Sequence, residues 1–92
     1  MQNVLFVRNL SFNTEDSELR KLFRNFGNVL SVRIPLNRQT GRSRGFGFVE
    51  MSTDQAAADA MKALNSQQIA GRKLQVSFSE QRDQRSTAYG IY

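Results

Sequence analysis

The sequence contains no cysteine and no histidine. Without cysteine the chain can form no disulfide and offers no thiolate to a metal, a composition that favours an intracellular protein while leaving nucleus, cytoplasm and organelle open. Without histidine, zinc sites and most acid–base catalysis near neutral pH lose their usual side chain. We therefore expect no metal site, no cofactor and no enzymatic activity.

Long apolar runs are missing as well. No stretch approaches the roughly 20 apolar residues of a membrane-spanning helix, and a strand-like segment follows Met1 almost directly, without a signal or transit pattern. We expect no membrane association. A chain of 92 residues can bury one modest core, which predicts a single domain. No feature specifies an oligomeric state, so a monomer is the default.

Positive charge is abundant and unevenly distributed. The formal net charge is +5, yet acids and bases cancel over residues 14–26 and again from residue 80 onward, and residues 52–65 sum to −1. The other charged residues leave +6: Arg8, Arg33, Arg38, Arg42, Arg44, Arg72 and Lys73 against Glu50. Such a concentration favours a polyanionic partner, although basic residues can also serve solubility alone.

Two helices are predicted by apolar residues at helical spacing. In the first, Thr14 is expected as the N-cap and Gly27 as the glycine that ends the helix. Its apolar stripe consists of Leu19, Leu22, Phe23 and Phe26. The second is expected to begin with a capping box formed by Ser52 and Gln55. Its stripe consists of Ala57, Ala60, Met61 and Leu64.

Four strands are predicted around these helices, over residues 4–8, 29–34, 45–51 and 73–78. Residues 36–43 should form an exposed basic loop and residues 67–71 a turn. The order is β-α-β-β-α-β. Two right-handed crossovers place both helices on the same side, so we expect an α+β, ferredoxin-like sandwich with a four-stranded antiparallel sheet and one open face.

Strand alternation assigns side chains to the two faces of this sheet. Arg44, Phe46, Phe48 and Glu50 should lie on the open face, whereas Gly45, Gly47, Val49 and Met51 should face the helices. The same alternation places further residues on the open face: Phe6 and Arg8 in the first strand, Arg33 in the second, Gln75 and Ser77 in the fourth. If the first and third strands are neighbours, three phenylalanines and several arginines form one surface, which suits unpaired bases and their phosphates.

The same segments resemble two signatures of the RNA recognition motif family. Residues 44–51, RGFGFVEM, match six of the seven specified positions of the longer signature, and residues 5–10, LFVRNL, match the shorter one. The departure is Met51, where the family usually has Phe or Tyr. Alternation places Met51 inside, so this difference concerns core packing.

This resemblance extends over residues 4–78 and implies specific roles. Phe6 and Phe48 would each stack on a base, Phe46 would pack against a sugar, Arg44 would pair with phosphate, and Gln75 and Ser77 would contact base edges. Arg8, Arg33, Arg42 and Glu50 complete the expected interface. Residues 1–79 would form the domain and residues 80–92 an extension that modulates access to the sheet. The expected partner is single-stranded RNA, with single-stranded DNA and other proteins left open.

Two other classes of function compete with this prediction. A protein-interaction module of the same fold would have its aromatic residues covered by a partner peptide or by its own tail. Acylphosphatases share the order of strands and helices, but nothing here resembles their phosphate loop, and Glu50 has no acid–base partner in the sequence. Gly45-x-Gly47 lacks the third glycine of a dinucleotide-binding loop and opens no helix.

Overall fold

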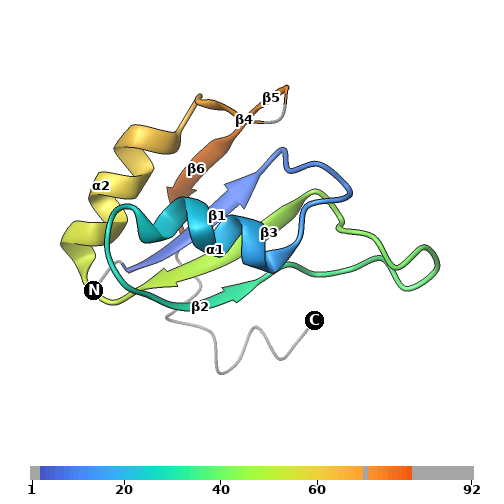
Figure 1. Cartoon of the computed structure of the whole chain (residues 1–92), viewed down its shortest axis with the longest axis horizontal. Helices are drawn as coiled ribbons and strands as arrows, with labels where there is room; N and C mark the ends of the chain where they lie inside the picture. The colour runs from blue at the N-terminus through green and yellow to red at the C-terminus, as the bar shows by residue number, and fades with distance from the viewer. Residues whose placement is uncertain (1–2, 70, 80–92) are drawn as a thin grey trace.

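A computed structural model describes residues 3–69 and 71–79. The elements follow in the order β1 (Val4–Arg8), α1 (Asp16–Arg24), β2 (Val29–Arg33), β3 (Phe46–Met51), α2 (Asp54–Leu64), β4 (Gln68–Ile69), β5 (Arg72–Lys73) and β6 (Gln75–Phe78) (Figure 1). The proposed extension, residues 80–92, lies outside the described residues. Its effect and the domain boundary at residue 79 therefore stay predictions.

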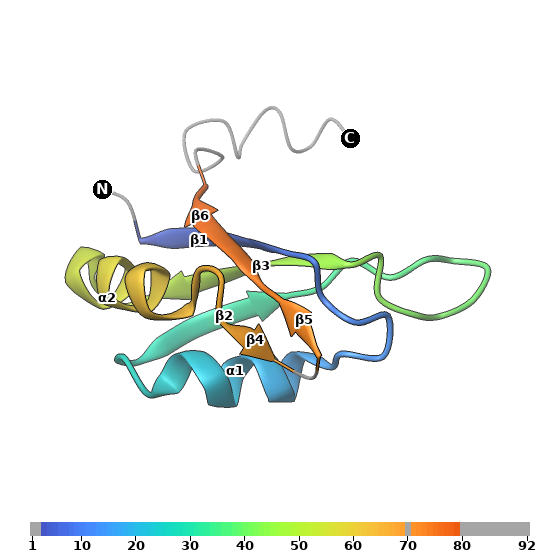
Figure 2. The ribbon, with the colours of Figure 1, turned by 90° about the horizontal axis from the view of Figure 1, so that it is seen from above.

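The main sheet has four antiparallel strands in the order β2-β3-β1-β6. Helix α1 lies along one side of the strands (Figure 2), and both helices contribute to a single core cluster. The expected ferredoxin-like arrangement is confirmed, including the contact between β1 and β3. Across the described strands, the second face of the sheet has no helix upon it.

The core consists of the residues that alternation assigned to the helix side. Leu5, Val7, Val49 and Met51 have no exposed surface, and neither does Phe23 of α1. Val76 and Phe78 of β6 point to the same side and pack against this cluster. Met51 thus fills a fully buried position, as its place in β3 predicted.

Both helices begin one residue later than expected. Glu15, instead of Thr14, is the N-cap of α1, and its N–H donates to the Glu18 carboxylate at 3.0 Å. Thr14 instead closes a turn, with its N–H donating to the Ser11 carbonyl. Helix α2 is capped by Thr53, whose hydroxyl accepts from the Ala56 N–H at 3.0 Å.

Ser52 is not the cap because it still belongs to the backbone pairing of the sheet. Its N–H donates to the Asn28 carbonyl at 2.9 Å, one step beyond the β2–β3 ladder. The C-terminal prediction for α1 was also wrong, since Asn25 is the C-cap and Gly27 lies further on. A Cβ at Gly27 would come within 2.7 Å of the Ala56 Cβ. Glycine at this position therefore allows the first turn of α2 to pack closely against it.

The segment expected as a turn, residues 67–71, contains a short hairpin. Gln68 pairs with Lys73 and Ile69 with Arg72, so Lys73 belongs to β5 and not to the last strand of the main sheet. Two-residue strands are too short for alternation to reveal them. They satisfy backbone groups that a plain turn would leave to water.

Strand β3 is one residue shorter at its start than expected, and β2 is one residue shorter at its end. Gly45 has a φ of +96°, which takes it out of the extended conformation before Phe46. Gly47 lies inside the strand, where a Cβ would come within 2.9 Å of the Arg33 carbonyl oxygen. Glycine therefore allows β2 to approach β3 closely at this point.

Candidate nucleic-acid interface

Three phenylalanines from two central strands lie together on the open face. Phe6 of β1 pairs in register with Phe48 of β3, and Arg8 pairs with Phe46. The Phe6 and Phe48 rings are stacked, with centroids 5.2 Å apart and planes 23° from parallel. Phe46 meets both rings edge to face, at 5.8 Å from Phe6 and 6.1 Å from Phe48. Phe6, Phe46 and Phe48 form an aromatic platform, and all three side chains are half-buried.

Arginines surround this platform. The Arg8 guanidinium lies over the Phe6 ring and that of Arg44 over the Phe46 ring, each 5.8 Å from the ring centroid. Arg33 of β2 is exposed and pairs in register with Phe48. The open face therefore combines π surfaces with positive charge, and each arginine keeps N–H groups available to a phosphate.

The β6 side of the platform carries polar groups. Gln75 pairs in register with Arg8 and Ser77 with Phe6, and both are exposed. The Arg8 guanidinium donates to the Gln75 Oε1 at 2.7 Å. Because arginine can only donate, this bond fixes the amide with its NH₂ group directed away from Arg8.

The opposite corner of the open face carries Glu50. Its carboxylate accepts a hydrogen bond from the Ser31 hydroxyl at 3.2 Å. Ser31 reaches it because the β2–β3 pairing shifts by one residue between Val29 and Ser31. The extra residue at this bulge, Leu30, is 56% exposed. Among the sequence-predicted site residues, Glu50 is the only acid.

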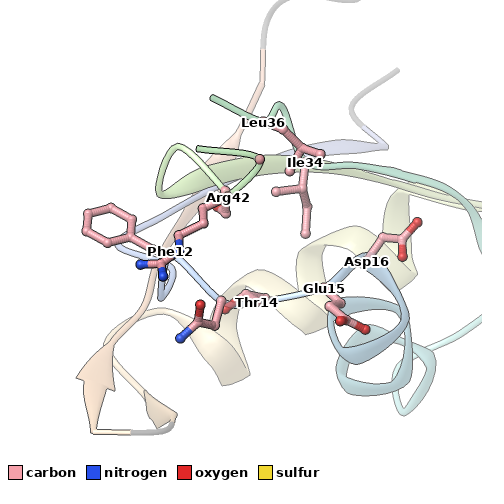
Figure 3. A pocket seen from close by; sticks show the side chains of 10 residues that line it. Phe12, Thr14, Glu15, Asp16, Ile34, Leu36 and Arg42 are labelled. Carbon is pink, nitrogen blue, oxygen red and sulfur yellow. The ribbon is translucent and has the colours of Figure 1, made fainter. Parts of the chain in front are cut away.

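Arg42 lies apart from the other predicted site residues. It belongs to the connection between β2 and β3 and lines a hollow between that connection and the first turn of α1 (Figure 3). Apolar side chains of Phe12, Ile34 and Leu36 share this hollow with Glu15 and Asp16. Phe12 and Leu36 are each 57% exposed. The hollow is on the helix side of the sheet, since Ile34 packs against the core.

A second polar cluster, which sequence reasoning missed, ties the end of β1 to the β4–β5 hairpin. Asn9, at a φ of +67°, donates through Nδ2 to the Lys73 carbonyl at 2.7 Å. Arg72 donates to the Asn9 carbonyl oxygen at 3.3 Å and to its Oδ1 at 3.0 Å. Arg72 therefore holds the segment that follows Arg8. The asparagine directly after a strand was the one sequence signal for this contact.

Residues 3–69 and 71–79 contain no group of three acidic, histidine or cysteine side chains placed to hold a metal ion. Within these ranges no helix combines the length and apolar character needed to cross a bilayer.

Comparison with known sequences gives a consistent assignment. The family model described as RNA recognition motif matches residues 5–75. The glycine-rich RNA-binding protein 4, mitochondrial, of Arabidopsis thaliana is 40% identical over 82 residues, which is 89% of this chain and 60% of that protein. The 28 kDa ribonucleoprotein, chloroplastic, of Spinacia oleracea is 43% identical over 82 residues, or 89% of this chain and 35% of that protein. The chain thus spans only part of the length of these relatives.

Solved structures agree with the sequence comparison. The crystal structure of RNA binding protein PG1 superimposes with a TM-score of 0.80 at 40% identity, covering 84% of this chain and 93% of that one. A chain of the Sxl-lethal protein/RNA complex has a TM-score of 0.80 at 30% identity, covering 84% of this chain and 47% of that one. The match to the family model covers most of the chain and includes the platform. The protein therefore belongs to the RNA recognition motif family.

Proposed function

We propose that this domain binds single-stranded RNA on its open face, without catalysing a reaction. The observation that carries the proposal is the aromatic platform, three phenylalanine rings in mutual contact on a face that neither α1 nor α2 covers. Large apolar groups gathered on an uncovered surface indicate a binding site. Bases that are unpaired present flat π surfaces to such rings, whereas bases inside a duplex do not.

Each predicted residue has a role that its position supports. Phe6 and Phe48 stack on bases, and Phe46, edge-on to both, packs against a sugar. Arg8, Arg33 and Arg44 meet phosphates around the platform, and Gln75 and Ser77 contact base edges from β6. Arg42 lines the hollow on the helix side. It therefore meets a phosphate only if the bound RNA extends past the connection between β2 and β3.

The relatives support the kind of partner and bear on the compartment. Their names describe RNA-binding and ribonucleoprotein functions, and those of the two plant proteins place them in mitochondria and chloroplasts. We extend RNA binding and an intracellular location to this chain.

A pair of phenylalanine variants tests the proposal. Phe48→Ala should weaken binding to fluorescent single-stranded RNA by about 1–3 kcal/mol, because one stacked base loses its partner. Phe12→Ala is the matched control, since it removes an exposed phenylalanine from the helix side. It should leave the dissociation constant within about twofold of the wild type.

Fluorescence anisotropy with RNA and with DNA of the same sequence measures both variants. Wild-type affinity in a folded Phe48→Ala variant would refute the proposed site. A wild-type protein that binds neither RNA nor DNA would favour the alternative of a protein-interaction module. Recovery of the RNA at its original length after incubation checks that binding occurs without cleavage.

A further inference from the structure

We propose that Glu50 selects a guanine base at the β2 corner of the open face, by accepting hydrogen bonds from its N1–H and N2–H₂ groups. The inference deepens the proposed function and rests on it. Glu50 is held in the site, and among the described residues it belongs to no group placed to hold a metal ion. Its carboxylate is therefore available to the ligand.

A carboxylate on this face opposes RNA binding unless it meets a base. Glu50 is the only acid in the four strands β1, β2, β3 and β6. Three arginines, Arg8, Arg33 and Arg44, lie on or beside the same face. The phosphates of a bound polyanion would therefore lie along this face. A negative charge there repels phosphate, and none of the described arginines or lysines forms an ion pair that neutralises it. Hydrogen bonds with a base edge would offset this repulsion.

The surroundings of Glu50 prepare it to accept hydrogen bonds. The Ser31 hydroxyl donates to its Oε1 at 3.2 Å, which restricts the carboxylate and leaves Oε2 without a hydrogen-bond partner among the described residues. Val4 pairs with Glu50 from β1, and Phe48 lies two residues back on the same face of β3. A base stacked on Phe48 thus has Glu50 beside it. The half-buried, partly apolar setting strengthens hydrogen bonds to the charge.

The chemistry of a carboxylate separates guanine from the other bases. Ionised glutamate only accepts, through two oxygens at a fixed spacing. Guanine presents two adjacent donors, N1–H and N2–H₂, on its Watson–Crick edge. Adenine and cytosine each present one amino group beside a ring nitrogen that also accepts and would repel the second oxygen. Uracil presents one N–H between two carbonyl groups, so guanine alone matches both oxygens.

The opposite corner of the platform, formed by Arg8 and Gln75, offers hydrogen-bond donors where Glu50 offers acceptors. The Arg8 guanidinium donates to the Gln75 Oε1, so the side-chain groups that remain on both residues are N–H donors. That corner suits phosphates or base carbonyls. A selective site for a base with two donors is therefore expected only beside Glu50.

A short uridine oligomer with one variable central nucleotide tests the inference. The wild type should bind the oligomer with central guanosine roughly tenfold more tightly than the one with central uridine, which corresponds to one bidentate contact. Inosine lacks only the 2-amino group and keeps N1–H. It should lose roughly fivefold relative to guanosine. Glu50→Ala should bring all three affinities within about twofold of one another.

Asp16→Ala is the matched control, because it removes the same charge from the first turn of α1 on the helix side. It should change all three affinities by a common factor and keep their ratios. Equal wild-type affinities for guanosine, inosine and uridine, or ratios that persist in Glu50→Ala, would overturn the inference. The proposed function would survive that result if Phe48→Ala still weakens binding. If no oligomer binds the wild type, both proposals fall together.

Discussion

At the scale of single residues, neighbouring side chains of β3 face opposite sides of the sheet and have different roles. Phe48 and Glu50 face the open side, whereas Val49 and Met51 have no exposed surface. The sequence predicted this division because alternation in a strand leaves only two choices, and glycines together with aliphatic residues mark the packed side. The same residue types in another order would have produced a different surface.

Met51→Asp tests the assignment directly. It places an unpaired charge among buried aliphatic and aromatic residues, so the domain should lose about 4 kcal/mol or more of stability, or fail to fold. Thermal unfolding followed by circular dichroism measures this loss. Phe48→Ala, three residues earlier on the open face, should keep a melting temperature close to that of the wild type. An unchanged melting temperature in Met51→Asp would show that the residues of β3 have been assigned to the wrong faces of the sheet.

The contact between Ser31 and Glu50 was beyond the reach of alternation. With straight pairing from Val29 and Met51, Leu30 would oppose Glu50, but the bulge moves Ser31 into that position. A bulge depends on the pairing of two strands that are distant in sequence, and neither strand encodes it alone. The bulge also leaves Leu30 exposed within this short strand.

At the scale of elements, the close contact between β2 and β3 depends on Gly47. Gly47→Ala would bring a Cβ within 2.9 Å of the Arg33 carbonyl oxygen and 3.1 Å of the Ile34 side chain. Because backbone has to shift, we expect a loss of about 1–3 kcal/mol in the free energy of unfolding. Gly41→Asn is the control, since Gly41 has open space around it and asparagine tolerates its φ of +74°. Denaturant titration of both variants gives the comparison, and equal stabilities would contradict the account.

The order of the two helices and the four strands of the main sheet could be predicted from the sequence, as could both ends of β1, but the helix starts could not. Periodicity identified both helices because each carries an apolar stripe over several turns. The start of α2 was misplaced by one residue because Ser52 and Thr53 are both residue types that commonly cap helices. Only the hydrogen bond from Ser52 to Asn28 across the sheet decides between them. The β4–β5 hairpin likewise depends on contacts that no local pattern reveals.

At the scale of the whole molecule, charge is separated between the open face, which has an excess of positive charge, and α1, whose charges cancel. Arg8, Arg33 and Arg44 accompany the platform against Glu50 alone, while Glu15, Asp16 and Glu18 at the start of α1 are offset by Arg20, Lys21 and Arg24 further along it. A polyanion is thereby attracted to the open face more than to α1. The sequence already predicted the excess of charge outside the helices, although the position of Arg42 required the structure.

Salt dependence tests this separation. Replacing Arg44 by glutamine should lower affinity for all RNA sequences about equally and reduce the slope of log affinity against log salt by about 0.7, the contribution of one phosphate contact to a single strand. Arg42→Gln should reduce the slope less, because Arg42 lines the hollow on the helix side. Titrations at several salt concentrations measure both slopes. A slope that is unchanged in Arg44→Gln would exclude it from phosphate binding.

The most direct measurement of the central claim is a map of the RNA contact on the protein. Backbone amide resonances can be followed by NMR while unlabelled single-stranded RNA is added to the ¹⁵N-labelled chain. We predict that the largest shifts occur in β1 and β3, at Phe6, Arg8, Phe46 and Phe48, with small changes throughout α1. Shifts centred on α1 or on the hollow around Phe12 and Leu36, with the platform unaffected, would contradict binding on the open face.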